Sequence, residues 1–102
     1  MIHVIAIITA KPGQRDAVLA AARANIPAVL AEDGCIEYAP AVDAEISRPL
    51  TKLGPDTFVF IEKWRDADAL KAHAASPHMA AYGAKVKELI ASRVIHVLSP
   101  AG

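Results

Sequence analysis

The first strand constrains the fold of this chain more than any other stretch. Residues 2–10, IHVIAIITA, are rich in β-branched side chains and end at the turn signal Lys11-Pro12-Gly13. Because side chains alternate along a strand, one face is wholly apolar and the other is apolar apart from His3 and Thr9. Helices can cover one face of a sheet that contains this strand, and the other face then needs a second layer.

The composition also favours a partner subunit. Hydrophobic residue types make up 54% of the 102 residues, more than one small domain can bury alone. We therefore expect a single domain over residues 1–102 that forms a homodimer. The 11 basic and 11 acidic residues balance, which disfavours nucleic acid and acidic membranes as partners. The single Cys35 and the shortness of the first apolar run favour a cytoplasmic protein with no membrane span.

The remaining patterns predict an α+β fold of ferredoxin-like order, β-α-β-β-α-β. We expect a helix over 14–31, strands over 35–44, 56–64 and 93–99, and a second helix that starts at Asp66 and is broken at Ser76-Pro77. The first helix should bury Val18, Ala22, Ile26, Val29 and Leu30, with a kink or break at Pro27. Two helices then cover one face of a four-stranded antiparallel sheet. The bare face predicts dimerisation through the sheets.

The stretch Phe58–Tyr82 holds most of the side chains that could carry chemistry. Alternation along the third strand places Phe58, Phe60, Glu62 and Trp64 on one face and an aliphatic pair, Val59 and Ile61, on the other. We expect the aliphatic pair to pack against the helices and the aromatic face to meet a cavity or the partner. A carboxylate between two aromatic residues is partly desolvated, which raises the pKa of Glu62 and suits it to acid–base chemistry. The alternative is a structural pairing of Glu62 with Arg93 or a histidine.

Two histidines follow this strand. His73 lies three residues after Leu70, on the face directed at the sheet, where it could reach a cavity bounded by Trp64 and act as a base. Alternatively, His73 is a core residue bonded to a backbone carbonyl. His78 lies one turn before Tyr82, at the pocket or at the surface. A five-residue spacing across Ser76-Pro77 does not place both histidines on one helical face, so we expect no metal site.

Three segments resemble the antibiotic biosynthesis monooxygenase family, and most of all its bacterial quinol monooxygenases. They are GCIEYAPAVD, PDTFVFIEKW and LKAHAASPHMAAY, and they contain the spacings E-x-W at Glu62 and Trp64 and H-x4-H at His73 and His78. The resemblance implies a dimeric α+β barrel with a cavity between sheet and helices. It also implies an oxygenase that needs neither metal nor flavin and acts with dioxygen on quinols or related phenols.

The resemblance also suggests roles for individual residues. His73 would be the base and Glu62 would tune or orient it, while the substrate-binding residues would be Trp64, Phe60, Tyr38, His78 and Tyr82. Other activities stay open: isomerisation of a small polar or phosphorylated carbonyl compound, or ligand binding without catalysis. The isomerase would need a cationic pocket, which only Arg48, Lys52 or Arg93 could supply. A fourth possibility is that dimer packing fills the cavity.

Overall fold

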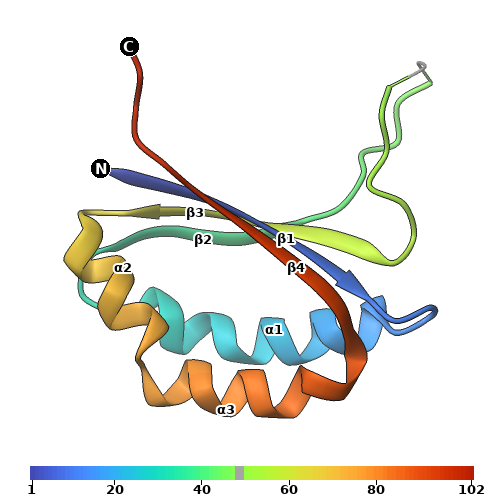
Figure 1. Cartoon of the computed structure of the whole chain (residues 1–102), viewed down its shortest axis with the longest axis horizontal. Coiled ribbons are helices and arrows are strands. Elements are labelled where there is room, and N and C mark those ends of the chain that lie inside the picture. The colour runs from blue at the N-terminus through green and yellow to red at the C-terminus, as the bar shows by residue number, and fades with distance from the viewer. Residues whose placement is uncertain (48–49) are drawn as a thin grey trace.

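A four-stranded antiparallel sheet with helices on one face forms the fold (Figure 1). The computed structural model describes residues 1–47 and 50–102. The elements are β1 (Ile2–Ala10), α1 (Arg15–Leu30), β2 (Cys35–Ala41), β3 (Thr57–Trp64), α2 (Ala67–Ala74), α3 (Pro77–Val86), the short 3-10 helix η1 (Lys87–Leu89) and β4 (Ile90–Leu98). The strand order is β2-β3-β1-β4, and every neighbouring pair is antiparallel. This confirms the predicted ferredoxin-like α+β fold.

The sheet register decides which side chains face the helices. Phe60 lies opposite Ala6, and Glu62 lies opposite Val4. Residues opposite each other in an antiparallel pair share a face, so the aromatic face of β3 joins the buried face of β1 beneath the helices. The predicted packing of Val59 and Ile61 against the helices was therefore wrong. Both lie on the uncovered face, because the register with β1 turns Phe60 and its aromatic neighbours toward the helices.

Helix α1 runs without interruption through Pro27 and ends three residues later at Leu30. The predicted break at Pro27 therefore does not occur, and only three residues of the helix follow this proline. Val29 is fully buried in that turn, whereas Leu30 is half exposed, so the predicted burial of Leu30 was wrong. With 16 residues, α1 is the longest helix. Within the described residues, no helix combines the length and apolarity needed to cross a bilayer.

The break between α2 and α3 lies where the capping residues predict it. Asp66 accepts a hydrogen bond from Ala69 N at 2.8 Å, and Ser76 Oγ accepts one from Met79 N at 3.4 Å. Pro77 occupies the first helical position of α3, where its missing N–H costs nothing. The chain thus changes direction between His73 at the end of α2 and His78 at the start of α3.

The described parts of the connection between β2 and β3, residues 42–47 and 50–56, project from one end of the sheet (Figure 1). Asp43 holds its two sides together, since its carboxylate accepts hydrogen bonds from Leu53 N at 2.8 Å and from Gly54 N at 2.9 Å. These backbone donors keep the pKa of Asp43 below its usual value. None of the described residues of this connection lines the cavity described next.

Candidate functional site

A cavity of about 420 Å³ lies between the sheet and the helices α2 and α3. Its walls are mostly apolar, and its polar side chains are Tyr38, Glu62, His73, Tyr82 and Arg93. Ile95 and Val97 of β4 line it as well, and each is 56% exposed. The volume and the mainly apolar lining are typical of a small-molecule site.

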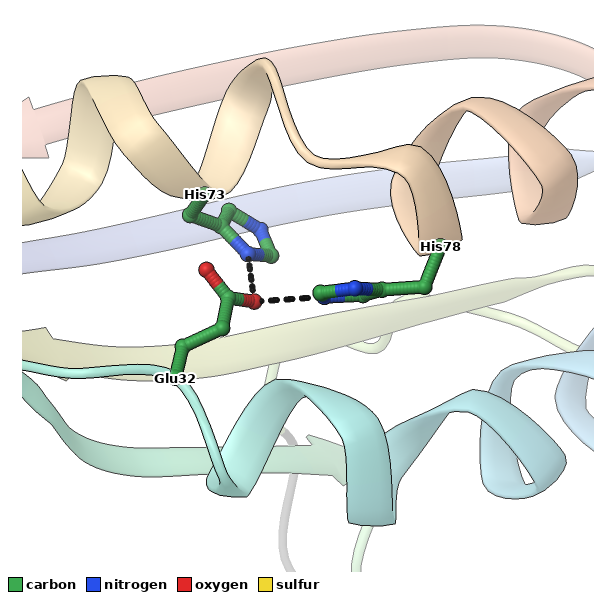
Figure 2. A group of neighbouring side chains, drawn as sticks. All are labelled: Glu32, His73 and His78. Carbon is green, nitrogen blue, oxygen red and sulfur yellow. Dashed lines mark hydrogen bonds and ion pairs between the residues drawn. The ribbon is translucent and has the colours of Figure 1, made fainter.

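His73 connects this cavity to a carboxylate outside it (Figure 2). The imidazole is buried on α2, and its Nδ1 lies 2.8 Å from Oε2 of Glu32, which follows the end of α1. A carboxylate only accepts hydrogen bonds, so Nδ1 donates, and in the neutral ring Nε2 is the nitrogen that can take up a proton. The ring also packs on Trp64 with centroids 4.5 Å apart. These contacts fix both the orientation and the tautomer of His73.

His78 binds the same carboxylate oxygen. Its Nε2 lies 2.8 Å from Glu32 Oε2 and 3.2 Å from Ser76 Oγ. The Ser76 hydroxyl donates to the His73 carbonyl at 2.7 Å, so both neighbours of His78 Nε2 act as acceptors and this nitrogen carries a proton. His78 does not line the main cavity, which departs from its expected place among the substrate-binding residues.

The two histidines lie on different helices, α2 and α3, as their spacing across Ser76-Pro77 predicts, but this does not keep their rings apart. The turn at Ser76-Pro77 directs both rings to one point between α1 and the α2–α3 corner (Figure 2). The ligand atoms of Glu32, His73 and His78 all lie within 4.8 Å of one another. Sequence reasoning missed Glu32, because nothing in the local pattern signals that its side chain turns inward and is only 12% exposed.

Glu62 lies on the cavity side of β3. Its Oε1 accepts a hydrogen bond from Trp64 Nε1–H at 2.9 Å. Burial raises the pKa of Glu62, and the Trp64 hydrogen bond and nearby His73 counteract this only in part. The predicted direction is confirmed. Its hydrogen-bond partner is Trp64, and not the Arg93 or histidine of the alternative interpretation.

The aromatic residues divide between the cavity and the layer behind it. Tyr38, Phe60 and Tyr82 line the cavity, and Tyr38 stacks on Phe60 with centroids 4.5 Å apart. Burial raises the pKa of both tyrosines, so their phenols stay protonated and can donate hydrogen bonds at neutral pH. Trp64, which we expected to form a pocket wall, is fully buried and does not line the cavity. It supports His73 and Glu62 from behind.

Of the three candidate cations, Arg93 lines the cavity. Lys52 belongs to a separate groove that it shares with Asp43 and Arg15. Arg48 lies outside the described residues. Positive charge in the cavity therefore comes from the exposed β4 side.

Comparison with known proteins fits this arrangement. The family model for antibiotic biosynthesis monooxygenase matches residues 1–85. The chain belongs to this family. A curated family relative, the probable quinol monooxygenase YgiN of Escherichia coli K12, is 41% identical over 102 residues, which cover 98% of each chain. The solved structure of Rv0793 from Mycobacterium tuberculosis superposes with a TM-score of 0.81 at 32% identity and covers 99% of this chain and 95% of that one. PA3566 from Pseudomonas aeruginosa also has a TM-score of 0.81, at 30% identity over 99% and 94%.

Proposed function

We propose that this chain is a cofactor-free monooxygenase that oxidises a quinol or related phenol with dioxygen. Family membership and the name of the Escherichia coli relative support this reaction class. The observation that carries the proposal is the pair His73–Glu32, which presents an oriented imidazole to an apolar cavity. A base of this kind is what oxidation of a phenol without a cofactor requires.

In the proposed reaction, Nε2 of His73 removes the proton of a phenolic hydroxyl. The Glu32 carboxylate then stabilises the imidazolium through the 2.8 Å hydrogen bond at Nδ1. The phenolate is electron-rich enough to pass one electron to dioxygen. The resulting radical pair combines into a ring hydroperoxide, whose O–O bond breaks to leave a ketone oxygen and water. One quinol and one dioxygen thus give one hydroxylated quinone and one water.

Glu62 and the tyrosines support this sequence by hydrogen bonding. A carboxyl with a raised pKa can deliver the proton that the departing hydroxide needs when the O–O bond breaks. The phenols of Tyr38 and Tyr82 remain donors and can orient the substrate oxygens. Phe60, stacked on Tyr38, offers a flat apolar surface to an aromatic ring. The mostly apolar walls screen these electrostatic contacts less than bulk water does, which strengthens each of them.

Oxygen uptake by chelator-treated protein with a series of benzo- and naphthohydroquinones tests the proposal. We expect His73→Ala to lower kcat by about 100-fold or more, since a general base contributes about 10²–10⁴-fold. Glu32→Gln should also lower kcat, because Gln cannot stabilise the imidazolium by charge. Lys71→Ala, an exposed change on the same helix, is the matched control. A His73→Ala variant as fast as Lys71→Ala would contradict the proposed base.

Arg93 favours the isomerase as the second candidate. Its guanidinium could bind a phosphate or carbonyl oxygen of a small polar substrate at the open side of the cavity. Isomerisation consumes no oxygen, so turnover that continues under argon and falls in Arg93→Ala would favour it. Binding of a ligand with no turnover in either atmosphere would favour a non-catalytic module.

The uncovered sheet face supports a homodimer as the assembly. Val59, Ile61, Val94 and Leu98 lie on this face, and the last three are substantially exposed. Apolar side chains on one flat sheet face are suited to packing against the same face of a second copy. We propose that this face is the dimer interface.

A further inference from the structure

The cluster Glu32–His73–His78 lies outside the main cavity apart from the His73 ring, and the proposed reaction uses only part of it. We propose that these three side chains form a binding site for a divalent transition-metal ion of the zinc and cobalt class. One carboxylate and two imidazoles are a donor set that such ions favour. The ligand atoms would be Oε2 of Glu32, Nδ1 of His73 and Nε2 of His78.

The spacing of these atoms suits a single ion. Ligands held about 2.0–2.2 Å from one ion lie about 3–3.5 Å from each other. Both nitrogens are 2.8 Å from the same oxygen, and all three atoms lie within 4.8 Å. Side-chain rotations that open these two contacts by a few tenths of an ångström, and bring the two nitrogens to about 3–3.5 Å from each other, would make room for an ion. It would replace the two protons that the nitrogens now share with the carboxylate.

The surroundings hold the ligands in place. Glu32 is 12% exposed, and His73 is buried between Trp64 and Tyr38. Ser76 Oγ donates to the His73 carbonyl and so ties the end of α2 to the start of α3. Its contact with His78 is made at Nε2, the proposed ligand atom, and would give way when an ion binds. The three ligands come from three segments, so the folded backbone brings them together before any ion arrives (Figure 2).

The cluster also has a route to solvent. Glu32 lines a surface groove together with Ser76 and Pro77, and the His78 side chain is 27% exposed. An ion could enter on this side without passing through the main cavity. Water could then complete its coordination. With two imidazoles and one carboxylate, the site should prefer zinc, cobalt or nickel over calcium and magnesium, which favour oxygen ligands.

A metal at Nδ1 would change His73 itself. A neutral imidazole that binds an ion through Nδ1 carries its proton on Nε2, and Nε2–H cannot accept a proton from a phenol. Bound metal should therefore inhibit the oxidation. This consequence, unlike the metal site, rests on the proposed function.

Calorimetric titration of the chelator-treated protein with Zn²⁺, and visible spectra with Co²⁺, test the site. We expect one ion per chain, cobalt bands typical of nitrogen and oxygen ligands, and a Tm that rises with zinc concentration. Glu32→Gln, His73→Ala and His78→Ala should each weaken binding by more than about 100-fold, since loss of an outer contact alone costs 10–100-fold. His96→Ala, which removes a histidine on the opposite face of the sheet, should bind like wild type.

His78→Ala keeps the test decisive if the changes at the buried residues unfold the chain, because His78 is the most exposed ligand. Three results would overturn the proposal: no zinc binding by wild type at millimolar concentration, equal binding by wild type and His78→Ala, or loss of binding in His96→Ala. Inhibition is measured separately, relative to the metal-free rate of each variant. Zinc binding without inhibition would overturn the role of His73 as base and leave the metal site standing.

Discussion

Gly34 sets the distance between the two segments that hold the site. Its φ of +86° lies in the left-handed region, and a Cβ built on it would stand 2.6 Å from Cβ of Ala69 on α2. The carbonyl of Gly34 also accepts a hydrogen bond from Arg65 N at 2.8 Å. Glu32 lies two residues before this contact, and His73 lies one helical turn after Ala69. The substitution Gly34→Ala therefore perturbs both the stability and the geometry of the site.

The expected cost has two parts. Placing a residue with a Cβ in the left-handed region costs about 1–2 kcal/mol. Overpacking against the buried Ala69 adds about 1–3 kcal/mol, because the clashing atom cannot rotate away. Gly34→Ala should thus lower the free energy of unfolding by about 2–5 kcal/mol. Gly13→Ala is the matched control, since Gly13 has a φ of +79° and no atom within 4 Å of the added Cβ. It should cost about 1–2 kcal/mol.

Urea denaturation measures the backbone cost and the overpacking cost separately. It is applied to four variants: Gly34→Ala, Gly13→Ala, Ala69→Gly and the double variant with Gly34→Ala and Ala69→Gly. The double variant should recover about 1–3 kcal/mol relative to additive effects, since loss of the Ala69 methyl group leaves room for the new Cβ. If Gly34→Ala costs no more than Gly13→Ala, or if Ala69→Gly gives no recovery, the close contact does not position α2. Refolded Gly34→Ala should also show weaker zinc binding, whereas Gly13→Ala should not.

Two further predictions concern Glu62 and the sheet face. Burial raises the pKa of Glu62 in the folded state above 4.5, so the native state binds this proton more tightly than the unfolded chain does. The free energy of unfolding should therefore fall as the pH rises from about 4.5 through the raised pKa. In Glu62→Gln, the urea midpoint should depend less on pH over the same range. A pH dependence equal to that of wild type would contradict the contribution of Glu62. Ile61→Lys, on the uncovered face, should convert a dimer to a monomer in analytical ultracentrifugation, whereas Leu30→Lys on α1 should not. A monomeric wild type would refute the proposed interface.

The sequence predicted the order of elements because the signals for them are local. Asp66, Ser76 and Pro77 mark helix starts through contacts within one turn, and the apolar face of β1 follows from alternation alone. Which face of β3 meets the helices is not local, since it depends on the pairing of Phe60 with Ala6. The predicted packing of Val59 and Ile61 failed for that reason.

In the candidate site, too, the sequence predicts what depends on local patterns and misses what depends on contacts across the fold. His73, Glu62, Tyr38, Phe60 and Tyr82 all line the cavity, since alternation along a strand and spacing along a helix assign a side chain to a face. Glu32 joins them through a tertiary contact between the end of α1 and the α2–α3 corner, 41 residues away along the chain from His73. No period in the sequence encodes such a contact.

The imidazole of His73 belongs to both proposed sites, and variants of its two neighbours test the base and the metal site separately. His73 faces the cavity on one side and Glu32 on the other. Glu32→Gln removes the charge that supports the base and a metal ligand, so it should weaken both oxidation and zinc binding. His78→Ala removes a ligand but leaves the contact between Glu32 and His73, so it should raise the zinc concentration needed for inhibition. If both variants change oxidation and binding in the same proportion, His73 and His78 act as one unit, and the division between base and metal site is wrong.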